Sequence, residues 1–270
     1  MKKSQARIDR IGETNFNTFN NKMEIIAYTT NLKVTIKFDD GYTIITSYSS
    51  FISGKIAHPL DKRVCGVGYM GYGEYTGWSN KIKNPEYSTW VRMFQRCYDE
   101  ATLKRTPTYN GCTVCEEWHN FQNFAKWYNK NYYKIENEQM HLDKDILVKG
   151  NKIYSPETCC FVSERINNLF VKCDKARGEL PIGVSYSKKN RNFSCQCRNG
   201  SGKNIHLGSF YNLNDAFNAY KIFKESLIRE TADKFKAIIP EKLYKAMYNY
   251  EVINDLATAE EIQEHLKENK

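Results

Sequence analysis

Residues 141–170 read HLDKDILVKGNKIYSPETCCFVSERINNLF, and this stretch is the most informative part of the chain for its fold. Residues 141–147 and 159–162 are two β-prone runs separated by a polar loop, which predicts two strands. Ser163 follows the second run and is expected to cap a helix that continues through Phe170. The stretch therefore predicts a strand–loop–strand–helix unit.

Alternation along the first strand separates its side chains into two groups. Successive side chains of a strand point to opposite faces, so His141, Asp143 and Asp145 are predicted to share one face. Lys144 is predicted to point to the opposite face. Any group that Asp143 faces is therefore expected to lie near His141.

The N-terminal part changes from a polar start to strand-forming sequence. From Met23 to Ile56, the runs MEIIAYTT and KVTIKFDDGYTIITSY are rich in β-branched and aromatic residues. Asp40-Gly41 lies between two such runs and predicts a tight hairpin turn. We expect residues 1–62 to form a small antiparallel β-barrel.

Glycines and aromatic residues are interleaved in the next segment. Residues 64–80 read VCGVGYMGYGEYTGWSN and lack the Gly-Lys-Ser/Thr ending of a phosphate-binding loop. Residues 63–84 are therefore predicted to be a linker that lies on a surface or contacts DNA.

Apolar residues at helical spacing follow the linker. In residues 88–100, STWVRMFQRCYDE, this spacing predicts a helix with Ser88 or Thr89 as its N-cap. In residues 115–132, CEEWHNFQNFAKWYNKNY, an aromatic stripe predicts a second helix packed in a core. Both helices belong to a predicted domain of residues 85–176.

The C-terminal part predicts a sheet followed by helices. Residues 177–239 are expected to form a module of three short strands and one long helix that opens near Asn212 or Asn214. Residues 240–270 are expected to add the helix EKLYKAMYNYEV and an acidic amphipathic helix, TAEEIQEHLKEN, which is a candidate surface for a protein partner. The fold class is therefore predicted to be α+β: an N-terminal β-barrel, a central helical ββα domain, and a C-terminal three-stranded sheet with a helix.

Charge and composition restrict the partners and the compartment. The 270 residues carry a formal net charge of +9, from 40 Lys+Arg against 31 Asp+Glu, which favours a polyanionic partner. No apolar run is long enough to cross a membrane, and the start MKKSQARIDR lacks the apolar core of a secretory signal. The nine cysteines are expected to be free thiols in a reducing cytoplasm.

Four motifs of the central domain are informative together: LDKDI, Gly150-Asn151, YSPETC and ERINN. With the preceding runs WVRMFQRCY, PTYNGCTVCEEW and NFQNFAKWY, they make residues 85–170 resemble a group of phage and mobile-element HNH-type endonucleases. The resemblance implies a ββα finger that holds one divalent metal ion, Mg²⁺ or Mn²⁺, on a phosphate. The expected compartment is the cytoplasm, that of a host cell if the chain is phage-encoded.

The resemblance also implies roles for six residues of the finger. HNH enzymes usually place a histidine directly after the first acidic residue, where this chain has Lys144. A protonated lysine is a poor base and a good phosphate contact, so His141 is the substitute for activating water. Carried over by position, the metal ligands are Asp143, Asp145 and Asn167, and the residues with catalytic roles are His141, Lys144 and Asn151, of which Asn151 braces the loop.

A single CxxC pair, Cys112 and Cys115, raises the question of a zinc site. Structural zinc needs two more ligands, for which Cys159, Cys160 and His119 are candidates at a spacing that matches no known finger. Buried free thiols are the better explanation, and zinc is not expected.

Residues 180–214 contain no acidic residue. In NFSCQCR, Phe193, Cys195 and Cys197 alternate with polar residues, so one face is predicted to pack on the following helix and the other to face solvent or DNA. The residues expected to contact DNA are Lys188, Lys189, Arg191, Gln196, Arg198 and Lys203.

The motifs GVSY, HLGSF and AFNAY in this region resemble the three-stranded DNA-binding domain of plant ethylene-response-factor proteins, which also occurs in phage homing endonucleases. The resemblance implies that the sheet lies in the major groove of double-stranded DNA. Arg and Gln side chains suit contacts to bases and Lys side chains suit phosphates, and the best matches are Arg191, Gln196, Arg198 and Lys203.

Three functions stay open at this point. The first is a sequence-specific, homing-type DNA endonuclease that needs a divalent metal. The second is a catalytically inactive DNA-binding protein on an HNH scaffold, acting as a phage regulator or a host-defence inhibitor. The third is a protein-binding role for the acidic C-terminal helix.

Overall fold

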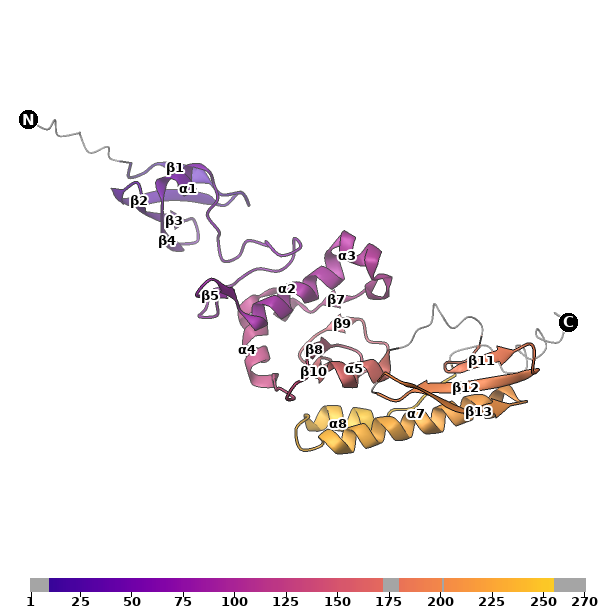
Figure 1. Cartoon of the computed structure of the whole chain (residues 1–270). Coiled ribbons are helices and arrows are strands. Elements are labelled where there is room, and N and C mark those ends of the chain that lie inside the picture. Colours follow the sequence, from indigo (N-terminus) through magenta and orange to yellow (C-terminus); the bar gives the residue numbers. More distant parts are fainter. Residues whose placement is uncertain (1–9, 172–179, 201, 255–270) are drawn as a thin grey trace, which may run out of the picture. The chain divides into compact units, whose positions relative to one another are not determined.

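The fold is mixed α+β with small, mostly antiparallel sheets (Figure 1). A computed structural model describes residues 10–171, 180–200 and 202–254. The chain divides into two compact units, residues 1–106 with 116–126, and residues 107–115 with 127–270. Within the described ranges, the helices are too short or too polar to cross a membrane.

Four antiparallel strands form the N-terminal sheet, in the order β1-β2-β3-β4. β3 and β4 are joined through Asp40-Gly41, which confirms the predicted hairpin. Gly41 has a φ of 92°, a left-handed conformation that glycine adopts without strain. The strand bounds are Thr14–Phe16 for β1, Lys22–Thr30 for β2, Lys33–Phe38 for β3 and Thr43–Thr46 for β4.

This sheet is open, so the predicted β-barrel is wrong. In the described part of the chain, β1 pairs with β2 alone and β4 pairs with β3 alone. The edge strands β1 and β4 have only three and four residues, and helix α1 (Tyr48–Ile52) covers the apolar face. The buried Phe51 of α1 packs there in one cluster with Met23, Ile25, Val34, Ile36, Phe38 and Ile56. The apolar face of the sheet is therefore buried by helix α1, whereas in a barrel it would be buried by closure of the sheet on itself.

The glycine-rich strap, residues 66–77, is held against α4 (Phe121–Asn131), which corrects the prediction of a linker. Gln122 donates from Nε2 to two strap carbonyls and accepts from the Tyr75 N–H, each at 3.0 Å. A Cβ added to Gly71 would overlap the side-chain amide of Asn120, so glycine is needed for this close approach.

The predicted helices of the central region are present. Trp90 and Phe94 of α2 are fully buried, as their spacing predicts. The helix begins at Pro85, earlier than the predicted caps Ser88 and Thr89, because the fixed φ of proline suits the first helical position. The elements here are β5 (Trp78–Ser79), β6 (Ile82–Lys83), α2 (Pro85–Tyr98), α3 (Glu100–Arg105), and the 3-10 turns Pro107–Tyr109 and Glu116–His119.

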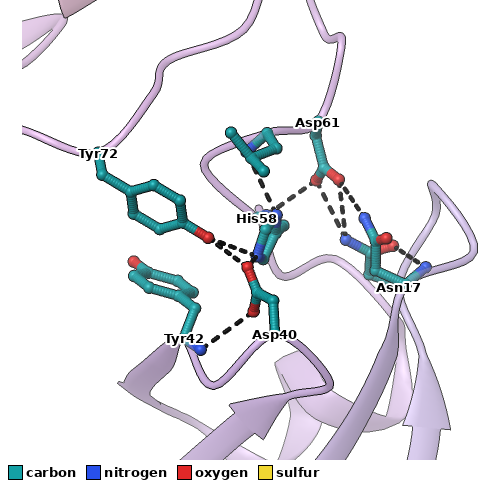
Figure 2. A network of polar contacts seen from close by, with 8 residues as sticks. Asn17, Asp40, Tyr42, His58, Asp61 and Tyr72 are labelled. Atoms are coloured by element: carbon teal, nitrogen blue, oxygen red, sulfur yellow. Dashed lines mark hydrogen bonds and ion pairs between the residues drawn. The ribbon is translucent and has the colours of Figure 1, made fainter.

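A polar network ties the hairpin turn of the first unit to the strap (Figure 2). The buried His58 lies with Nε2 3.0 Å from the Asp40 carboxylate, and Tyr72 donates its hydroxyl to the same carboxylate. His58 Nδ1 accepts the Leu60 N–H at 3.2 Å, so Nε2 carries the proton that Asp40 accepts. Asp61 accepts the His58 backbone N–H at 2.8 Å. Both ring nitrogens of His58 are therefore engaged within the fold.

The described residues of the second unit include three small sheets and the helices α5, α7 and α8. β8 pairs with β10, β7 pairs in parallel with β9, and β11-β12-β13 form an antiparallel sheet. The strands are β7 (Thr113–Val114), β8 (Met140–Asp143), β9 (Ile153–Tyr154), β10 (Cys160–Ser163), β11 (Val184–Ser187), β12 (Asn192–Arg198) and β13 (Asn204–Phe210). The helices are α5 (Glu164–Phe170), α7 (Leu213–Phe235) and α8 (Glu241–Tyr248).

Of the C-terminal helices α7 and α8, α7 begins where the sequence predicts and α8 ends earlier than predicted. α7 begins after Asn212, whose side chain accepts the Asn214 N–H at 2.7 Å, as predicted. α8 ends at Tyr248, although the sequence EKLYKAMYNYEV predicts a helix through Val252. Residues 249–253 instead leave the helix and pack against α7. The predicted acidic helix, residues 258–269, lies outside the described residues.

Candidate functional site

The strand–loop–strand–helix order predicted for residues 141–170 is present in the second unit. β8 and β10 are antiparallel neighbours, with Asp143 opposite Cys160 and His141 opposite Val162. Ser163 caps α5 and accepts the Ile166 N–H at 3.3 Å. Helix α5 packs against both strands, so the two strands and the helix form one finger.

The first strand is shorter than predicted, because Asp143 turns the chain. Its Oδ1 accepts the N–H groups of Asp145 at 2.9 Å and of Ile146 at 2.7 Å, and this bonding replaces the strand ladder. His141 and Asp143 still belong to one strand and share a face, as predicted. Asp145 lies beyond the end of the strand, so strand alternation does not fix the direction of its side chain.

Asp143 is the most strongly perturbed acid of the finger. Burial, and after it the Asp145 carboxylate, raises the pKa of Asp143 from 3.8 to about 6. A carboxyl with a raised pKa beside a second carboxylate is an arrangement that a bound cation relieves. Carboxylate oxygens are the ligands that Mg²⁺ prefers, so the two side chains fit a divalent ion.

Lys144 and Asn151 organise the loop around these carboxylates. The buried Lys144 also lies beyond the end of the strand, and its Nζ lies 3.2 Å from the Asp145 carboxylate. Asn151 donates from Nδ2 to the carbonyls of Lys144 and Ile153, both at 2.7 Å. Asn151 thus has the geometry of a loop brace. Asn167, the remaining predicted ligand, is half-buried on α5.

Cysteines lie in and beside the finger, and two of them, Cys159 and Cys160, are buried neighbours in the chain. Burial raises the pKa of Cys159 to about 12 and also raises the pKa of the Cys160 thiol. Cys112 is buried and Cys115 is half-buried. Among the described residues, no three His, Cys, Asp or Glu side chains are arranged to hold a metal ion.

The sheet β11-β12-β13 has the two-sided character that the sequence predicts. Phe193, Cys195 and Cys197 of β12 are buried against α7, whereas Gln196 and Arg198 are exposed. The outer face also carries polar residues of β13 that sequence reasoning did not select, such as His206 opposite Gln196 and Asn204 opposite Arg198. Alternation in NIHLGSF was the signal that would have identified them.

Basic side chains lie at both ends of this outer face. Lys188, Lys189 and Arg191 occupy the turn between β11 and β12, and Lys203 lies in the turn between β12 and β13. β12 extends from Asn192 to Arg198, six steps or about 20 Å at 3.3 Å per residue. That length exceeds the width of a B-DNA major groove, about 12 Å, so the ends of the sheet can meet both flanking backbones.

No family model matches the chain, and no curated protein or solved structure is significantly similar to it. The functional argument therefore rests on the residues of the finger and of the basic sheet.

Proposed function

We propose that the chain is a homing-type DNA endonuclease of the HNH class, directed to its site by the basic sheet. The observation that carries the proposal is the exposed polar face of β12 and β13, which has basic side chains at both ends and no acidic residue between residues 180 and 214. This face has the charge and length to bind double-stranded DNA.

In this proposal the sheet divides its contacts by residue type. Gln196 and Arg198 reach base edges, because their planar groups make paired hydrogen bonds in the major groove. Lys188, Lys189 and Lys203 contact phosphates and position the sheet. Much of the affinity is then electrostatic and falls steeply with salt.

Cleavage is assigned to the finger. Asp143 and Asp145 would hold the divalent ion, with Asn167 as the third side chain. When bound, Mg²⁺ or Mn²⁺ stabilises charge on the scissile phosphate and on the leaving oxygen. His141, on the strand face of Asp143, accepts the proton of the attacking water. Asn151 keeps the loop in place.

One observation favours a second function, a catalytically inactive DNA-binding protein. Lys144 occupies the position of the usual HNH histidine, and its ammonium lies 3.2 Å from the Asp145 carboxylate. A paired ammonium does not act as a base, so catalysis depends on His141 alone. If His141 does not act as the base, the chain binds DNA without cleaving it, as a phage regulator or a host-defence inhibitor.

Plasmid nicking separates the two functions. The full chain is incubated with supercoiled DNA in Mg²⁺ or Mn²⁺, and nicked and linear products are measured. Asp143→Ala is expected to abolish cleavage and leave DNA affinity unchanged, whereas Asp39→Ala, at an exposed aspartate of the first unit, is the matched control. Salt-sensitive DNA binding without cleavage in either metal ion would establish the inactive protein, and failure to bind DNA at low salt would point to a protein partner.

A further inference from the structure

Helix α7 belongs to two hydrophobic clusters of the second unit, one with residues of the predicted domain 85–176 and one with residues of the predicted domain 177–239 (Figure 1). Its first half packs against the DNA-binding sheet through Phe217 and Tyr220. Its second half packs against the finger through Ile228 and Ala232, in the cluster that contains Leu169 of α5. The helix contains no glycine or proline, so it is a continuous support for both parts.

A second element joins the same parts. The C-terminal clip, residues 249–253, follows α8 and lies against the middle of α7. Both backbone polar groups of Val252 form hydrogen bonds with side chains of α7. The N–H donates to Glu225 at 2.9 Å, and the carbonyl accepts from Lys221 Nζ at 3.0 Å. The Val252 side chain is buried in the cluster of the sheet.

The clip also contacts the finger. The rings of Tyr250 and Phe170, the last residue of α5, meet edge-on at 4.9 Å. Lys149, in the loop between β8 and β9, lies 5.6 Å from the Tyr250 ring and donates to the Glu251 carbonyl at 3.4 Å. The clip thus touches α7, the sheet cluster and the loop that carries Asn151.

Glu225 is the centre of this connection. It is only 9% exposed, and its carboxylate binds Lys221 at 3.1 Å and Arg229 at 3.6 Å in addition to the Val252 N–H. A buried carboxylate with several partners holds one geometry, because each lost partner leaves a charge or a polar group unpaired. Removing the carboxylate leaves the Val252 N–H without its acceptor and Lys221 without its ion pair, so it is expected to loosen the clip on α7.

We propose that Glu225 is a positioning residue, which acts through the clip to hold the finger at a fixed distance from the DNA-binding sheet. This inference rests on the proposed endonuclease function. Phe217 and Ala232 mark the sheet contact and the finger contact on α7, and about fifteen residues at 1.5 Å separate them by about 22 Å. At 3.4 Å per base pair, this length corresponds to about six or seven base pairs. The cut is then expected at one constant offset, within about one turn of the bases that the sheet contacts.

Mapping of cut positions tests the inference. The full chain is given a duplex that carries a sequence selected by binding, and the cuts are located at nucleotide resolution relative to the protected bases. The wild type is expected to cut at one offset. Glu225→Ala is expected to spread the cuts over several positions and to slow cutting at least tenfold, with DNA affinity within twofold of the wild type. Glu230→Ala, at an exposed acid on the same helix, is the matched control.

The outcomes distinguish this inference from the proposed function. A wild type that binds but cuts no DNA overturns the proposed function and the inference with it. Glu225→Ala protein that cuts at the wild-type offset and rate overturns the inference alone. If Glu225→Ala does not fold, Lys221→Met removes the bond to the Val252 carbonyl and the ion pair with Glu225 while the Glu225 carboxylate remains, and an unchanged cut pattern in that variant also overturns the inference.

Discussion

Asp143→Asn is expected to stabilise the finger in metal-free solution while abolishing DNA cleavage. Burial, followed by the Asp145 carboxylate, raises the Asp143 pKa from 3.8 to about 6. At 1.36 kcal/mol per pKa unit, ionised Asp143 costs the folded state about 3 kcal/mol. Asparagine removes the charge, and its Oδ1 can still accept the N–H groups of Asp145 and Ile146.

The size of the gain depends on pH in a defined direction. Between the two pKa values of 3.8 and about 6, the unfolded chain loses this proton while the folded chain keeps it. Wild-type stability therefore falls as the pH rises through this window. The advantage of Asp143→Asn is absent below the window, about half developed at pH 5 and complete above pH 6.

Hydrogen exchange of the β10 amides, converted to opening free energies in EDTA at pH 5 and pH 8, measures this effect. Asp143→Ala is the control, because it removes the charge and also the acceptor of the turn. Its stability is expected to fall short of that of Asp143→Asn. The reasoning is refuted if Asp143→Asn is no more stable than the wild type at pH 8, or if its gain is the same at both pH values.

Arg198→Ala is expected to weaken DNA binding by roughly 5- to 150-fold, the equivalent of 1–3 kcal/mol, in anisotropy titrations at fixed salt; an unchanged affinity would exclude Arg198 from the base contacts. Lys188→Ala is expected to reduce the slope of log K against log salt by about 0.9, without a change of sequence preference. Gly71→Ala is expected to accelerate chymotrypsin cleavage at Tyr72, because the added Cβ overlaps the side chain of Asn120, the residue before α4. The hydrogen bond from Tyr72 lowers the pKa of Asp40 in the folded chain. Ionised Asp40 therefore stabilises the folded state above its unfolded pKa of 3.8, and this stability is lost as the pH falls through the lower pKa of the folded state. Tyr72→Phe is expected to return the Asp40 pKa toward 3.8 in an NMR titration of the carboxyl group.

Signals that act over a few residues predicted their elements well. The alternation of Phe193, Cys195 and Cys197 predicted the buried face of β12. Ser163 predicted the N-cap of α5, since the cap needs only a hydroxyl three residues before the N–H that it accepts. The early end of β8 at Asp143 was missed because a side chain that bonds its own backbone competes with a strand ladder.

Contacts between distant residues decided the features that the sequence left open. The N-terminal sheet stays open because α1 buries its apolar face. The glycine-rich strap is packed because Gln122, far along the chain, satisfies its backbone groups. Neither contact has a local signature, so a barrel and a linker were the natural predictions.

The sequence by itself determined the chemistry that this protein carries: a basic, acid-free sheet and a finger with neighbouring carboxylates at Asp143 and Asp145. Only the tertiary structure decided how the two are joined. α7 enters both cores, and Glu225 binds the backbone of Val252 across 27 positions of the chain. The physical reason is that residue types and short spacings set local propensity and charge, whereas burial depends on which distant surfaces meet.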